Sequence, residues 1–115
     1  MAKPSLATSA MPNPVLEELA ILGKDIGIAR RRRRISRQEM AVRMMVNPKT
    51  VDRMENGDPK LSIGILATAL WVLGMQKRLG SLISPESDKT GTQEEIRRLP
   101  QAIRTINAQA DDFDF

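Results

Sequence analysis

The stretch from Ile35 to Gly57 reads ISRQEMAVRMMVNPKTVDRMENG and carries the clearest structural pattern in the chain. It predicts two short helices joined by a tight turn. Ser36 is a favoured N-cap residue and Glu39, three positions later, completes a capping-box pattern, so a helix is expected to begin here. Asn47 and Pro48 give a second start signal, because Asn caps well and Pro suits the first helical position, where a missing N–H costs nothing.

Each of the two predicted helices has one apolar side. The apolar residues are Met40, Ala41 and Met44 in the first helix and Val51 and Met54 in the second. Spacings of three and four residues place them on one face, which is expected to pack inward. Gly57 ends the second helix, because glycine tolerates the left-handed conformation that commonly follows a helix.

The other side of the second helix carries polar side chains that suit DNA. These residues are Asn47, Lys49, Thr50 and Arg53. A helix that presents such groups from its N-terminal turns can reach base edges in the major groove, so we expect base contacts from all four. The alternative is that Lys49, Thr50 and Arg53 only keep this face of the helix in water.

Composition narrows the classes of function. The chain has 115 residues and contains neither Cys nor His. Disulfides and thiolate metal sites are thereby excluded, and the commonest metal ligand and general base is missing, so we expect no cofactor, no metal and no enzymatic activity. No apolar stretch is long enough to span a membrane, and the basic start lacks the apolar core of a secretory signal. We therefore expect a cytoplasmic protein that works on the nucleoid.

Charge is distributed unevenly along the chain. Residues 22–53 carry ten Lys and Arg against three acids, a net charge of +7, although the whole chain carries only +4. Residues 84–115 carry four basic against seven acidic residues, a net charge of −3. The basic segment suits the release of counterions from phosphates, whereas the acidic end is expected to meet a different partner.

The pattern predicts three regions. Residues 1–13 are rich in proline and lack periodicity, so they are expected to form a disordered arm. Residues 14–83 are expected to form one helical domain. Residues 84–115 are expected to be a partly disordered C-terminal extension that is available to a partner.

The first helix of the domain is expected to start at Asn13-Pro14, another cap-and-proline pair. Gly23 and Gly27 lie near its middle. Because glycine weakens a helix by about 1 kcal/mol relative to alanine, a break near Leu22 is expected.

Further helices are expected after the Ile35–Gly57 stretch. Ser62 caps a fourth helix that Gly74 closes, residues 75–83 form a fifth, and residues 92–99 form a short helix capped by Thr92. The expected inward residues of the fourth helix are Ile63, Leu66, Ala69, Leu70 and Leu73.

Residues 22–79 resemble the lambda-repressor-like, or Xre-type, helix-turn-helix regulators. The markers are Glu55-Asn56-Gly57, Ile35-Ser36 and Glu39-Met40-Ala41. This resemblance implies an all-α bundle of about five helices, with a flexible N-terminal arm and a C-terminal extension. It also implies a structural ion pair between Arg30 and Glu55.

The chain departs from that family at Arg37, where a glutamine commonly contacts phosphate and braces a base-reading residue. The resemblance implies the phosphate role for Arg37, which an arginine can fill. We expect phosphate contacts from Arg33, Arg34, Ser36, Arg37 and Arg43. The alternative for the run Arg30 to Arg34 is a solvated basic face.

The segment after the fourth helix is similar to the HipB-type antitoxins that are encoded beside HipA-family kinase toxins. The matching motifs include Ala67-Thr68-Ala69-Leu70, Val72-Leu73-Gly74, Arg78-Leu79 and Leu99-Pro100. The resemblance implies a homodimer that binds a palindromic operator, represses its own operon and holds the kinase toxin. We assign Trp71, Phe113 and Phe115 to the partner interface, with cover by the C-terminal region as the alternative for Trp71.

Two other classes of function compete with an antitoxin. One is a stand-alone phage-like or chromosomal Xre-type repressor without a toxin. The other is a small enzyme or an RNA-binding module. That class is disfavoured, because the chain lacks His, Cys and a phosphate-cradling glycine loop, and three aromatic residues cannot form a base-stacking platform.

Overall fold

The computed structural model describes residues 10–101, and all regular structure in that range is helical. The helices are α2 (Asn13–Arg32), α3 (Arg37–Met44), α4 (Pro48–Glu55), α5 (Ile63–Val72), α6 (Gln76–Gly80) and α7 (Lys89–Arg97). The all-α prediction is confirmed for these residues. Most of the expected N-terminal arm lies outside the described residues, and so do Phe113 and Phe115. No helix within residues 10–101 combines the length and apolar character needed to cross a bilayer.

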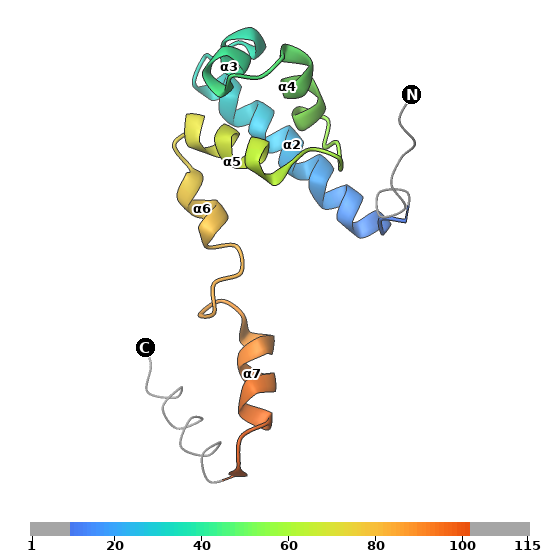
Figure 1. Ribbon diagram of the computed structural model, residues 1–115, viewed down its shortest axis with the longest axis vertical. Helices are drawn as coiled ribbons and strands as arrows, with labels where there is room; N and C mark the ends of the chain where they lie inside the picture. Colours follow the sequence, from blue (N-terminus) through green and yellow to red (C-terminus); the bar gives the residue numbers. More distant parts are fainter. Residues whose placement is uncertain (1–9, 102–115) are drawn as a thin grey trace. The chain divides into compact units, whose positions relative to one another are not determined.

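The chain divides into two compact units between Leu79 and Gly80, slightly before the boundary expected after residue 83. In the first unit, α3, α4 and α5 gather beside the C-terminal half of α2, and the first turns of α2 extend beyond them (Figure 1). The core residues are Ile26, Ile35, Met40, Ala41, Met44, Val51, Met54, Ala69 and Leu73. The apolar sides predicted for α3 and α4 are thus both buried.

α2 is one continuous helix, so the predicted break near Leu22 is wrong. Its two central glycines are buried where α2 meets the end of α4. A Cβ on Gly23 would lie 2.6 Å from the carbonyl oxygen of Met54, and one on Gly27 would lie 2.8 Å from Oε1 of Glu55. These glycines therefore allow two helices to approach closely, and packing compensates for their low helix propensity.

The N-caps predicted within the first unit are confirmed at three helices. Ser36 Oγ accepts the amide of Glu39 at 3.0 Å, and Asn47 Oδ1 accepts the amide of Lys49 at 2.9 Å. Ser62 Oγ accepts the amide of Ile65 at 3.2 Å. Each side chain satisfies a donor that has no partner inside its helix.

The predicted start of the first helix at Asn13-Pro14 is confirmed, because α2 begins at Asn13, but Asn13 is not its cap: the helix follows Pro12 and has no side-chain cap. Two other predicted helix starts or ends are wrong. α7 begins earlier than expected because Asp88 is its cap, with Oδ1 accepting the Gly91 amide at 3.0 Å. Thr92 lies within that helix and donates its hydroxyl to the Asp88 carbonyl. The fifth helix of the expected domain, α6, already ends at Gly80.

Helices α2 to α5 end in the same way. At each end one residue has a positive φ, the C-cap itself in α3 and the residue after the C-cap in the other three helices, and the next amide bonds back across the last turn. The positive-φ residues are Arg34 (56°), Met45 (57°), Gly57 (75°) and Gly74 (77°). Only the two glycines are predictable from the sequence, because a left-handed conformation is unfavourable for Arg and Met.

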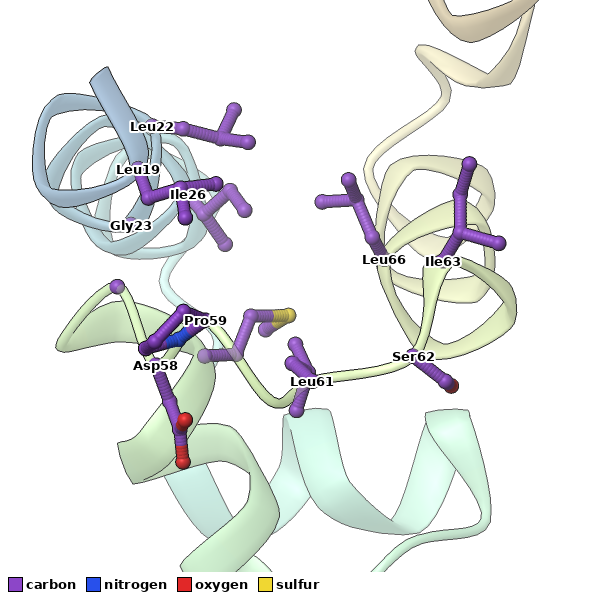
Figure 2. Close-up of a pocket in the computed structure, with 12 residues that line it drawn as sticks. Leu19, Leu22, Gly23, Ile26, Asp58, Pro59, Leu61, Ser62, Ile63 and Leu66 are labelled. Atoms are coloured by element: carbon purple, nitrogen blue, oxygen red, sulfur yellow. The ribbon is translucent and has the colours of Figure 1, made fainter. Parts of the chain in front are cut away.

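The apolar face predicted for α5 is confirmed only in part, because Leu66 packs against the core whereas Leu70 is half-buried and is not among the residues that pack there. Ala69 and Leu73 are buried, but Ile63 is 72% exposed, so its assignment to the core is wrong. Ile63 is at the rim of an apolar pocket of about 220 Å³ between α2, the α4–α5 loop and α5. Figure 2 shows Leu22 and Ile26 of α2 facing Leu66 across this pocket.

Candidate nucleic-acid interface

A buried ion pair holds α4 against the rest of the first unit. Arg30 Nε lies 2.8 Å from Glu55 Oε2, and Nη2 donates to Glu55 Oε1 at 3.1 Å. Nη1 donates to the carbonyl of Ile35 at 2.9 Å. One guanidinium therefore ties together the end of α2, the segment before α3 and the last residue of α4.

This is the ion pair that the family resemblance implies. The side chains of Arg30 and Glu55 are only 7% and 8% exposed. A charge buried this deeply needs its partner, because the ion cannot regain its water shell when the partner is removed. The pair thus couples the orientation of α4 to that of α2. Any groups on the outer face of α4 are presented on a fixed helix.

α4 presents its cationic residues on the side opposite its buried residues. Val51 and Met54 are buried, whereas Lys49 and Arg53 are exposed and Thr50 is half-buried. Asn47 is exposed at the N-cap, where its Oδ1 is already used. Its amide nitrogen still has two donors to offer outward. The four residues predicted to contact bases therefore all reach the surface.

Arg53 has an anionic neighbour that sequence reasoning missed. Its Nε donates to Asp58 Oδ2 at 2.6 Å, and Asp58 Oδ1 accepts the amide of Lys60 at 2.9 Å. The hydrogen bond from Arg53, followed by the bond from the Lys60 amide, holds the pKa of the Asp58 carboxyl below its ordinary value. Asp58 is therefore a carboxylate at neutral pH.

Arg37 leans toward α4 from the first position of α3. Its Nε lies 3.6 Å from Asp52 Oδ1 and 3.8 Å from Glu55 Oε1, and its side chain is mostly exposed. Those distances are longer than a hydrogen bond, so the attraction is electrostatic and weak in water. Arg37 remains free to meet a phosphate with most of its donors.

The other residues predicted to contact phosphate are also exposed. Arg43 Nη2 bonds to Glu39 Oε1 at 2.7 Å, an exposed pair one helical turn apart. Glu39 is therefore paired with Arg43 and does not bond back to the amide of Ser36, as the expected capping box would require. Arg33 Nη1 donates to the carbonyl of Ala29 at 2.8 Å, where it satisfies a group near the end of α2. Pairs of this exposed kind contribute little stability and exchange easily.

Trp71 lies on α5 and is 63% exposed. No residue of α5 is charged. A helix that is apolar on all sides is normally covered on all sides. Trp71 is therefore accessible within the described residues, while Phe113 and Phe115, the other expected partner contacts, fall outside residues 10–101.

Sequence reasoning missed the acidic partners of the site arginines. Asp58 follows Gly57, and a residue after a C-terminal glycine lies beside the helix residue five positions earlier. That spacing links Arg53 to Asp58 and is visible in the sequence. The nearness of Asp52 to Arg37 depends on how α3 crosses α4, so no local signal reveals it.

No family model, no curated protein and no solved structure matches this chain.

Proposed function

We propose that this protein binds double-stranded DNA in a sequence-specific way and acts as a transcriptional repressor. In this proposal α3 and α4 form a helix-turn-helix, α4 is the recognition helix, and α2 to α6 correspond to a lambda-repressor-like bundle. The observation that carries it is the two-sided character of α4. Val51 and Met54 are buried in the core, while Lys49 and Arg53 project from the opposite face of a helix that a buried ion pair holds in place.

The chemistry of that face suits the major groove. Arginine and lysine donate to guanine O6 and N7, and asparagine pairs with adenine, so Asn47, Lys49, Thr50 and Arg53 can read base edges. Arg37 and Arg43 on α3, with Arg33 and Arg34 after α2, supply exposed cations for the sugar-phosphate backbone. The hydroxyl of Ser36 and the amides of the first turn of α3 suit a phosphate as well.

The same proposal includes a homodimer on a palindromic operator. Two recognition helices about 34 Å apart would meet successive major grooves, because that distance is one turn of B-DNA. The exposed Trp71 supports a further protein partner. With the resemblance to HipB-type antitoxins, it leads us to propose a HipA-family kinase toxin as that partner, so that the protein represses its own operon and restrains the toxin.

Fluorescence anisotropy tests DNA reading directly. The full chain is titrated onto a labelled duplex from the region upstream of its own gene, and onto a scrambled duplex, at near-physiological salt. A specific repressor is expected to prefer its operator by about a thousandfold or more. Equal, weak binding to both duplexes contradicts the proposal.

A separate experiment distinguishes an antitoxin from a stand-alone repressor. A HipA-family kinase encoded beside the gene is mixed with the purified chain and with a Trp71→Ala variant, and complexes are resolved by size-exclusion chromatography. The antitoxin proposal expects a complex that Trp71→Ala weakens and that Val42→Ala, a change at another exposed apolar residue, does not. The absence of any complex, or of such a kinase gene, favours the stand-alone repressor.

A further inference from the structure

The end of α4 places Arg53 and Asp58 next to each other through the backbone. The Asp58 amide donates to the Arg53 carbonyl at 3.0 Å, and the Gly57 amide donates to the Met54 carbonyl at 3.1 Å. With the positive φ of Gly57, these two bonds form a Schellman motif. In that motif the side chains of the third-last helix residue and of the second residue beyond the cap are neighbours, usually as an apolar contact. Here they form an ion pair.

The Asp58 carboxylate is held from a second direction. Its Oδ1 accepts the amide of Lys60 at 2.9 Å, a bond that spans Pro59. The proline ring restricts the backbone between them, so the turn has little freedom. Figure 2 shows Pro59 beside the apolar pocket and the Asp58 carboxylate turned away from it. The anion is thus fixed before any ligand arrives.

This contact uses only one edge of the Arg53 guanidinium. Nε donates to Asp58 Oδ2 at 2.6 Å, while Nη1 and Nη2 together carry four further N–H donors. The Arg53 side chain is 49% exposed, so these donors have access to solvent. The end-on pair of Nη groups is the part of arginine that binds O6 and N7 of guanine together.

We infer that Asp58 is a positioning residue that holds Arg53 ready for guanine and thereby sets the base preference at one position of the bound DNA. This inference rests on the proposed DNA-reading role of α4. An arginine loses much rotamer freedom when it binds in one geometry. Asp58 removes part of that freedom beforehand, and it does not touch the DNA itself. The base read by Arg53 is therefore guanine.

A competing consequence of the same contact is sequestration. If Asp58 withheld Arg53 from DNA, loss of the carboxylate would strengthen operator binding and leave or increase the preference for guanine. Loss of a positioning residue instead weakens that preference at one base pair. The preference for guanine at that base pair therefore distinguishes the two roles, because it falls only when a positioning residue is lost.

The experiment uses the full chain and duplexes that the wild-type protein selects from a randomised library. The selected duplex is varied one base pair at a time, and anisotropy gives affinities for wild type, Arg53→Ala, Asp58→Asn and Asp52→Asn. Arg53→Ala identifies the base pair that Arg53 reads. Asp58→Asn keeps an oxygen acceptor for the Lys60 amide, so the turn is retained, and thermal unfolding checks that the fold is intact. Asp52→Asn is the matched control, because it removes one negative charge from α4 and leaves the contact between Asp58 and Arg53 in place.

The expected result is that Asp58→Asn lowers the preference for G·C at the Arg53 position by about threefold to tenfold, the scale of ordering one long side chain. Other positions and the affinity for scrambled duplex do not fall, and Asp52→Asn keeps the preference. An unchanged or stronger preference in Asp58→Asn overturns the inference alone, as does a base other than guanine at the Arg53 position. A wild-type chain that selects no sequence overturns the proposed function, and the inference with it.

Discussion

Replacing Gly23 by alanine tests whether α2 and α4 pack as closely as the structure indicates. The new Cβ would lie 2.6 Å from the Met54 carbonyl oxygen, 2.7 Å from that of Glu55 and 2.8 Å from the Gly57 amide nitrogen. Ordinary van der Waals contact begins at 3.4 Å, and all three opposing atoms belong to backbone, which cannot rotate away. The helices must therefore separate.

The expected cost follows from two opposing terms. Overpacking a close contact costs about 1–3 kcal/mol and occasionally more, and three backbone clashes place this site at about 3–4 kcal/mol. Alanine recovers about 1 kcal/mol of helix propensity relative to glycine. The net loss in the free energy of unfolding is about 2–3 kcal/mol, which lowers the Tm of a domain of this size by about 8–24 °C.

Thermal unfolding followed by circular dichroism measures this change. Gly64→Ala is the matched control, because its Cβ would meet only Ser62 Oγ, at 4.0 Å. That variant is expected to be more stable than wild type, by about 0.5–1 kcal/mol. A Gly23→Ala variant as stable as wild type would refute the close packing of α2 on α4.

Other perturbations have equally definite expected outcomes. Glu55→Ala leaves the buried Arg30 charge without a partner, so the free energy of unfolding measured in urea should fall by about 3–5 kcal/mol, whereas loss of an exposed ion pair costs under about 1 kcal/mol. Met45→Gly should raise stability by about 0.5–1 kcal/mol, because a side chain 91% exposed at φ 57° leaves no cavity and its backbone strain is relieved; a lower Tm would count against this. Because folding lowers the Asp58 pKa, its stabilising contribution is complete above the unfolded pKa near 4 and is lost as the pH falls through the lower, folded value. The stability difference between wild type and Asp58→Asn should therefore shrink below about pH 4, and a constant difference would contradict the pairing. DNA affinity should fall with salt at a log–log slope of about −0.9 per phosphate neutralised, and a flat dependence would exclude phosphate contacts.

Local sequence signals were enough to predict where α3 and α4 begin, where α4 ends, and which sides of the two helices are buried. Ser36 and Asn47 predicted the helix starts, Gly57 predicted the end of α4, and spacings of three and four residues predicted which sides are buried. These signals are readable because capping and periodicity involve residues only a few positions apart. The partnership of Arg30 with Glu55 came from a family resemblance, and no local rule predicts a pair separated by 25 positions.

The roles of Gly23, Asp52 and Ile63 are visible only in the folded protein. Gly23 counts against a helix when propensity is considered alone, yet it marks the place where α4 crosses α2. Asp52 lies near Arg37 because α3 packs against α4, and Ile63 lines a pocket yet is 72% exposed. Sequence periodicity identifies the buried side of a helix, but the partner that covers each position depends on how the helices cross in space.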